Sequence, residues 1–483
     1  MHPGIVLRTL SYILLIIAGC MIMPAAIAVI NGEKNEFFAI VLSAGIAVVI
    51  FFIIKFFSRG SDSETLSTRD GFLFVTLSWI TASLIGALPY YISGAIPSFT
   101  DAYFETMSGF TTTGASILTQ IEILPQSLLF WRSLTHWLGG MGIVVLTVAI
   151  LPALGIGGLQ LINAEAPGPT VDKLTPRIAE TAKILWFIYL GLTVLETILL
   201  MFGGMNLFDA LTHTFGTVAT GGYSTKNTSV AYYNSAYIDG VITLFMVLAG
   251  INFSLHFWLL RGKFENLLKD SELKGYLAIF SISTLIITWN VSGTTYNSIG
   301  ESFRFASFQV ASILTTTGFA TADYEKWPFM SQAVLFILMF VGGCSGSTGG
   351  GIKVLRLITL LKQGINEMKY LIHPRGVFTL RINRRPVKKD IVYGISGFFF
   401  LYILMLLITT FIAASSGADV ETSFTSALAT LGNIGPGFGK VGPTDNFAFF
   451  PAYVKWWFSF AMLAGRLELY TVLILFTTVF WKK

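Results

Sequence analysis

The chain consists largely of apolar stretches that are long enough to cross a lipid bilayer as helices, which need about 20 residues to do so. Composition agrees, because 54% of the 483 residues are hydrophobic and only 12% are charged, against about 25% charged in soluble domains. We therefore predict an all-α polytopic membrane protein and exclude a soluble enzyme. The ten predicted spans cover residues 5–30, 37–57, 71–96, 128–153, 181–204, 238–260, 275–292, 331–361, 391–414 and 452–481.

Four clusters rich in Thr and Gly lie between alternate pairs of spans. Each follows a shorter, moderately apolar stretch that is typical of a short helix. The clusters are Thr111-Thr112-Thr113-Gly114, Val218-Ala219-Thr220-Gly221, Thr315-Thr316-Thr317-Gly318 and Gly432-Asn433-Ile434-Gly435. This order of span, short helix, cluster and span recurs about every 100 residues and indicates an internal repeat. We predict repeats at 67–160, 175–264, 272–365 and 387–483, after an extra helix pair at 1–66.

The clusters carry the chemistry that the repeat implies. A non-helical segment inside a membrane must be buried in protein or line a watery cavity, because lipid cannot satisfy its backbone groups. Four such segments around one central pore would present carbonyl oxygens to the axis. A ring of carbonyls can replace the hydration shell of a potassium ion. The sequence therefore predicts a potassium filter made by these sixteen residues.

An acidic residue stands near the start of each short helix: Asp101, Asp209, Glu301 and Glu421. An acid in the first helical turn satisfies free amides and complements the helix dipole. The alternative is that four acids at a pore mouth attract cations. The two roles are compatible.

The clusters and their order resemble the Trk/Ktr/HKT superfamily of potassium transporters, and within it the TrkH family, over the whole chain. The resemblance implies that the cluster backbones form the filter and that potassium is the substrate, with no covalently bound cofactor. It also implies a homodimer in a bacterial cell inner membrane and a cytosolic ring of nucleotide-binding subunits of the TrkA type. The fourth cluster departs from the pattern, since Asn433 and Ile434 replace threonines.

A Gly-rich stretch interrupts the apolar segment at 331–361. It reads Gly342-Gly343-Cys344-Ser345-Gly346-Ser347-Thr348-Gly349-Gly350-Gly351. Each Gly inside a helix costs about 1 kcal/mol relative to Ala, so a straight helix is disfavoured. The stretch is either a hinge with close helix packing or an unwound loop beneath the filter that acts as a gate. The family resemblance favours the gate.

Arg466 lies inside the last apolar segment, where a charge is costly unless it is paired or faces water. We predict that it faces the pore, hydrogen-bonds carbonyls of the 342–351 loop and repels cations. The alternative is a buried ion pair with Glu468 or Glu196.

Charge distribution predicts the orientation of the chain. The connections that we place in the cytoplasm hold the excess of Lys and Arg, as the positive-inside rule requires, so both termini are expected in the cytoplasm. The net charge of +5 is thus no sign of nucleic-acid binding. The longest basic connection runs from Lys353 to Lys389, and we expect Arg384 and Arg385 there to contribute to the surface for the cytosolic ring.

Two other functions are alternatives to a channel-like pore. A proton- or sodium-coupled potassium symporter built on broken helices is the alternative within transport. An intramembrane serine protease is a remote alternative, because Gly343-Cys344-Ser345-Gly346 matches a protease pattern that also needs a histidine, for which His256 is the candidate. The protease reading leaves the four repeats unexplained.

Overall fold

The computed structural model describes residues 3–58, 67–142, 178–383 and 385–482. Three of our predictions reach beyond these ranges: the second span of the first repeat after residue 142, the repeat boundaries at 66, 160 and 175, and Arg384. Within the described ranges the chain is almost entirely helical, and its one sheet is a short antiparallel hairpin of β1 (Arg381–Ile382) and β2 (Arg385–Pro386).

Five continuous helical stretches in the described residues are long and apolar enough to cross a membrane. Two bent helix pairs raise this number to seven if each pair forms one span. The prediction of a polytopic helical membrane protein is therefore confirmed, although ten spans are not all demonstrated. The five stretches are α1 (Pro3–Cys20) with α2 (Ile22–Asn31), α3 (Lys34–Phe57), α4 (Thr68–Ile92), α9 (Ile178–Phe202) and α18 (Lys389–Ala414).

A short buried helix precedes each Thr/Gly cluster, as predicted. These are α5 (Phe99–Phe110), α10 (Leu207–Val218), α15 (Ile299–Leu314) and α19 (Val420–Leu431). The side chain of Ser98, Asn206, Ser298 or Asp419 caps each helix by accepting a backbone N–H of its first turn. The four predicted acids lie in those first turns, so their place at the helix start is confirmed. A short 3-10 turn follows each cluster: η1 (Ile121–Ile123), η3 (Ser229–Tyr233), η4 (Tyr324–Lys326) and η5 (Gly439–Val441).

The helix that follows each cluster is interrupted. In the first repeat α6 (Gln126–Trp137) passes into the π-helical turn η2 (Leu138–Gly142). In the second, α11 (Ala236–Ala249) meets α12 (Phe253–Leu260) at 101°. In the fourth, α20 (Ala452–Arg466) meets α21 (Tyr470–Leu473) and η6 (Ile474–Phe476) at 114°.

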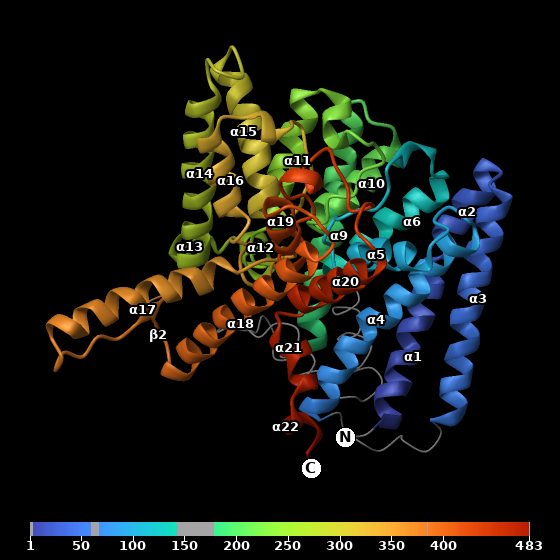
Figure 1. Ribbon diagram of the computed structural model, residues 1–483, viewed down its shortest axis with the longest axis horizontal. Coiled ribbons are helices and arrows are strands. Elements are labelled where there is room, and N and C mark those ends of the chain that lie inside the picture. The colour runs from blue at the N-terminus through green and yellow to red at the C-terminus, as the bar shows by residue number, and fades with distance from the viewer. Residues whose placement is uncertain (1–2, 59–66, 143–177, 384, 483) are drawn as a thin grey trace.

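The third repeat departs furthest from our expectation. The stretch at 331–361 is not one span, because α16 (Phe329–Leu338) ends before the Gly-rich loop and a separate helix, α17 (Val354–Ile372), begins after it. Figure 1 shows α17 projecting sideways beyond the other helices, beside the β-hairpin and α18. Its apolar residues occupy one face only, and Leu361, Leu371 and Ile372 are exposed. Sequence hydropathy alone could not separate such an amphipathic helix from a span.

The remaining helices complete the bundle. α1 packs against α3 within the extra pair and against α4 of the first repeat, and α14 (Ser271–Val291) packs against α15, α16 and α17. Two short helices, α13 (Phe264–Lys269) and α22 (Thr478–Trp481), lie at the ends of the second and fourth repeats. In Figure 1 the start of α1 and α22 lie at the same end of the molecule, α10 and α15 lie toward the opposite end, and α5 and α19 lie near the middle.

Candidate ion pathway

The four clusters share one backbone conformation. In each, two successive amides bond to carbonyls three and five residues earlier, at the end of the preceding short helix. The bonds are Thr112 N to Gly109 O with Thr113 N to Ser108 O, Thr220 N to Thr217 O with Gly221 N to Gly216 O, Thr316 N to Ile313 O with Thr317 N to Ser312 O, and Asn433 N to Thr430 O with Ile434 N to Ala429 O.

Two residues of each cluster have a positive φ. The first is Thr112, Thr220, Thr316 or Asn433, with φ between 52° and 58°. The second follows two residues later and is always a glycine: Gly114, Gly222, Gly318 or Gly435, with φ values of 82°, 79°, 85° and 99°. A positive φ is strained for a β-branched residue such as threonine and typically costs about 1–3 kcal/mol. Such strain is kept only where the surrounding structure enforces it, as in a functional site.

This conformation corrects the alignment of the second cluster. Gly222 corresponds to Gly114, whereas Gly221 corresponds to Thr113, and Val218 is still part of α10. The segment equivalent to 111–114 is therefore 219–222. Two adjacent glycines hid this in the sequence. The position of Asp209 was the available signal, because Asp209 lies as far before Gly222 as Asp101 lies before Gly114.

The four segments contact one another in chain order and close a ring. A methyl group on Gly114 would lie 2.2 Å from Gly221 O, and one on Gly222 would lie 2.0 Å from Thr317 O. The same test gives 2.3 Å from Gly318 to Ile434 O and 2.8 Å from Gly435 to Thr113 O. Carbonyl oxygens thus crowd the glycine of the adjacent segment, and a Cβ there is sterically excluded.

The threonine hydroxyls next to the glycines mostly bond to neighbouring protein atoms. The hydroxyl oxygens of Thr111 and Thr113 lie 2.8 Å apart, and those of Thr315 and Thr317 lie 2.7 Å apart. In the divergent fourth cluster, the Asn433 amide donates to Thr113 Oγ1 (2.9 Å) and to the carbonyl of Met462 (2.9 Å). Asn433 therefore joins the fourth segment to the first.

The Gly-rich loop packs directly against these segments. Gly350 N donates to Thr316 Oγ1 (2.7 Å), and Thr348 Oγ1 donates to Val218 O (3.0 Å). A methyl on Gly350 would lie 2.5 Å from Gly432 O. The loop thus contacts the second, third and fourth repeats at the ends of their short helices, as expected for a loop beneath the clusters.

Arg466 bonds to this loop, as predicted. One terminal nitrogen donates to Thr348 O (2.7 Å), and the other donates to Gly139 O (2.8 Å) and Gly140 O (3.0 Å) in the first repeat. The alternative pairing with Glu468 is wrong, because Glu468 forms its ion pair with Arg356 on α17. The other alternative partner, Glu196, is fully buried and neither of its carboxylate oxygens has a hydrogen-bond partner among the described residues.

Two further anchors of the loop were missed by sequence reasoning. Glu272 at the start of α14 accepts hydrogen bonds from Ser345 N (2.7 Å) and Leu355 N (3.0 Å) through one carboxylate oxygen. Lys353 Nζ donates to Gly349 O. Both are charged residues at the edge of apolar stretches, which was a weak signal. Their partners lie far away in sequence or on the backbone, so no motif marks them.

The acids of the first helical turns differ in their surroundings. Asp101 forms an ion pair with Lys455 on α20 (2.7 Å), and Asp209 accepts from Thr225 Oγ1 (2.8 Å). Glu301 and Glu421 are exposed. The protease candidates do not meet: Ser345 N bonds to Glu272, and His256 Nε2 bonds to Leu248 O.

Comparison with known proteins identifies the family. The model of the TrkH family, described as cation transport proteins, matches residues 39–483. The Trk system potassium uptake proteins TrkH of Halomonas elongata and of Escherichia coli K12 are 43% and 40% identical, each over 100% of both chains. The crystal structure of the potassium transporter TrkH from Vibrio parahaemolyticus superposes with a TM-score of 0.89 at 36% identity, covering 100% of both chains. The chain belongs to the TrkH family of cation transport proteins.

Proposed function

We propose that this protein takes up potassium through a channel-like filter made by the four clusters, with the 342–351 loop as its gate. The observation that carries the proposal is the closed ring of four segments, in which carbonyl oxygens face the glycines of their neighbours. Carbonyl dipoles arranged around one axis suit a weakly hydrated cation. The relatives at 40–43% identity are named as potassium uptake proteins, which supports potassium as the substrate.

The gate follows from the position of the loop and Arg466. The loop lies against the inner ends of the short helices, and the guanidinium of Arg466 joins it to the first repeat. A positive charge near a narrow pore opposes the passage of cations. Movement of the loop and Arg466 together would open the path.

The membrane setting and partners belong to the same proposal. We place the protein in the bacterial inner membrane with both termini in the cytoplasm, by the positive-inside rule, and as a homodimer. A cytosolic nucleotide-binding ring of the TrkA type would dock on the basic connection between α17 and α18. Reversing the charges of Arg384 and Arg385 should weaken binding of such a ring to the purified protein, and unchanged binding would remove this surface from the proposal.

The filter is tested with purified protein in liposomes. Current should reverse at the potassium equilibrium potential and should not follow a proton or sodium gradient. A reversal potential that shifts with either gradient would instead establish the coupled symporter. Gly435→Ala should abolish potassium flux, because Gly435 has a φ of 99° and a methyl there has no room beside Thr113 O.

The gate is tested with Arg466→Ala and with a deletion inside the loop. Both variants should raise the initial rate of rubidium uptake, because they remove the charge or the obstruction. Unchanged rates in both variants would disprove the gate while leaving the filter in place.

A further inference from the structure

Each short helix supplies one side chain that bonds to the chain just after the cluster glycine. In the fourth repeat, Thr425 Oγ1 accepts from Phe438 N (3.1 Å) and donates to its carbonyl (2.8 Å). In the second, His213 Nε2 lies 2.9 Å from Ser224 Oγ. In the third, the amide of Gln309 is oriented with its oxygen toward the backbone N–H groups, and this oxygen accepts from Thr321 N at 2.9 Å. We call the three residues that follow each cluster glycine the outgoing strand, although they belong to no β-sheet. These side chains attach the outgoing strand to the short helix of the same repeat.

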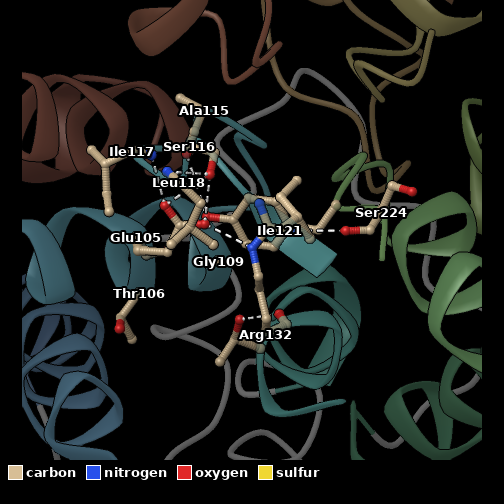
Figure 2. A network of polar contacts seen from close by, with 12 residues as sticks. Glu105, Thr106, Gly109, Ala115, Ser116, Ile117, Leu118, Ile121, Arg132 and Ser224 are labelled. Atoms are coloured by element: carbon tan, nitrogen blue, oxygen red, sulfur yellow. Dashed lines mark hydrogen bonds and ion pairs between the residues drawn. The ribbon is translucent and has the colours of Figure 1, made fainter. Parts of the chain in front are cut away.

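The first repeat performs this task with a buried charge pair. Glu105 accepts from Ser116 Oγ (3.0 Å) and Ile117 N (2.9 Å), and its carboxylate also accepts from Arg132 Nε on α6 (2.7 Å). Figure 2 shows Glu105 and Arg132 converging on this strand, with Ser224 of the second repeat at the side. Glu105 is 1% exposed and Arg132 is 2% exposed.

Arg132 also connects the outgoing strand of the first repeat to that of the second repeat. Its terminal nitrogen donates to Ser224 O (2.9 Å), and its guanidinium lies 3.5 Å from the centre of the Tyr223 ring. The Tyr223 hydroxyl in turn donates to the carbonyl of Glu105 (2.7 Å). Tyr223 directly follows Gly222, so this network ties together the outgoing strands of two neighbouring clusters.

A buried ion pair is poor evidence for stability, since apolar residues of similar volume often stabilise a protein as well. What an arginine fork adds is fixed geometry, because its donors lie in one plane and point in set directions. The spacing and field of the filter carbonyls decide how well potassium is distinguished from sodium. We therefore relate this network to the discrimination between potassium and sodium, which depends on the positions of the carbonyls, rather than to the free energy of unfolding.

We propose that Glu105 and Arg132 are positioning residues that fix the spacing of the first and second filter segments and thereby set the preference for potassium over sodium. This inference rests on the proposed filter. It assigns the role to a charge pair that touches no ion and lies behind the filter.

The chain contains a matched control. Arg304 on α15 forms an ion pair with Asp239 on α11 through the same nitrogen, at the same 2.7 Å, and it also joins two neighbouring repeats. Within the described part of the chain, Arg304 donates to no carbonyl of a cluster or of its outgoing strand. Replacing Arg304 by lysine should therefore leave the positions of the filter carbonyls unchanged.

The test compares Arg132→Lys, Glu105→Gln, Arg304→Lys and Gly114→Ala, each purified and reconstituted in liposomes, by the ratio of initial potassium to sodium uptake rates. Lysine keeps the positive charge at position 132, but it lacks the planar guanidinium that donates to Glu105 and to Ser224 O at the same time. Glutamine keeps the acceptor for Ile117 N, as Gln309 does in the third repeat. We expect both variants to retain potassium uptake and to lower the ratio about tenfold, which corresponds to ~1.4 kcal/mol. Arg304→Lys should keep the ratio of the unmodified protein.

A ratio unchanged in whichever of Arg132→Lys and Glu105→Gln can be purified would overturn the inference. An equal fall in Arg304→Lys would also overturn it, since any bridging arginine would then suffice. Gly114→Ala separates this from the filter itself, because its methyl would meet Gly221 O at 2.2 Å. If that variant transports with an unchanged ratio, the filter proposal fails; if it alone loses transport or selectivity, only the role of the charge pair fails.

Discussion

Removing the carboxylate of Glu272 should release the Gly-rich loop from both of its ends. Glu272 is 5% exposed, and a single oxygen accepts the amides of Ser345 and Leu355 at 2.7 and 3.0 Å. In Glu272→Ala these two amides lose their buried acceptor. The loop should then leave its place beneath the four clusters more often, although its bonds to Arg466 and Lys353 remain.

The size of the effect follows from the two bonds. Burial raises the pKa of Glu272 to about 7, so its carboxylate is charged above that pH. There a hydrogen bond to a charged group contributes about 1.5–3 kcal/mol, and two of them contribute at least ~3 kcal/mol to holding the loop. Since every 1.4 kcal/mol is a factor of ten, the ratio of released to held loop should rise about a hundredfold. Glu272→Gln keeps an acceptor oxygen without the charge, so each bond falls to about 0.5–1.5 kcal/mol. On the lower limits the two bonds together lose about 2 kcal/mol, and the rise should be about thirtyfold.

Hydrogen exchange measures this ratio directly. Amides within 342–355 should exchange about a hundred times faster in Glu272→Ala, with Glu272→Gln between that variant and the unmodified protein. Peptides from α5 serve as the internal control and should not change. The reasoning is refuted if loop exchange stays within a factor of two in both variants, because the loop would then be held without Glu272.

Three other predictions follow from single contacts. Asn433→Thr restores the sequence pattern of the other clusters, yet it should lower the free energy of unfolding by about 2 kcal/mol, because it removes the amide bonds to Thr113 and to α20; an increase in melting temperature would contradict this. The backbone amide of Thr422 donates to Asp419 and lowers the pKa of its carboxyl group, so the stabilising effect of Asp419 should be present near neutral pH and be lost as the pH falls through that lowered pKa. Asp419→Asn, also a good cap, should lack this acid-dependent loss in thermal melts. Asp419→Ala should cost about 1 kcal/mol at neutral pH. Glu468→Gln removes the carboxylate charge that pairs with Arg356 in a buried site and should cost about 3 kcal/mol of stability; a loss below about 1 kcal/mol would show that the pair is replaceable.

Local patterns were sufficient to predict most of the fold. The short helices could be predicted because an acidic first turn and a glycine lie at a nearly constant distance in sequence, as at Asp209 and Gly221. The Gly-rich loop could be predicted because glycine disfavours a helix wherever it stands. The hydrogen bond from Arg466 to the loop followed from the cost of an unpaired charge in a membrane.

Long-range pairing and exact alignment could not be predicted in this way. Glu105, Arg132 and Glu272 each act on backbone atoms, and a backbone partner leaves no trace in the side-chain sequence. The shift from Gly221 to Gly222 needed the φ values, because both residues are glycine. The position of α17 outside the bundle depends on which face of this helix packs against its neighbours. The apolar residues of α17 alone do not distinguish it from part of a membrane span.

The anchors of the loop also indicate how a gate built this way would open. Its contacts reach all four repeats: Gly139 and Gly140 through Arg466, Val218 through Thr348, Glu272 through Ser345, and the fourth repeat through the bond from Arg466 to Thr348 O. Bonds that share one short segment cannot be broken independently, because displacing any part of it strains the others. Opening would therefore be one cooperative transition between held and released states rather than the motion of a free flap. A change at any anchor, including Arg356 and Glu468 at the base of α17, should then shift the same equilibrium. Under the proposed function, a partner that binds α17 would control ion passage without touching the clusters.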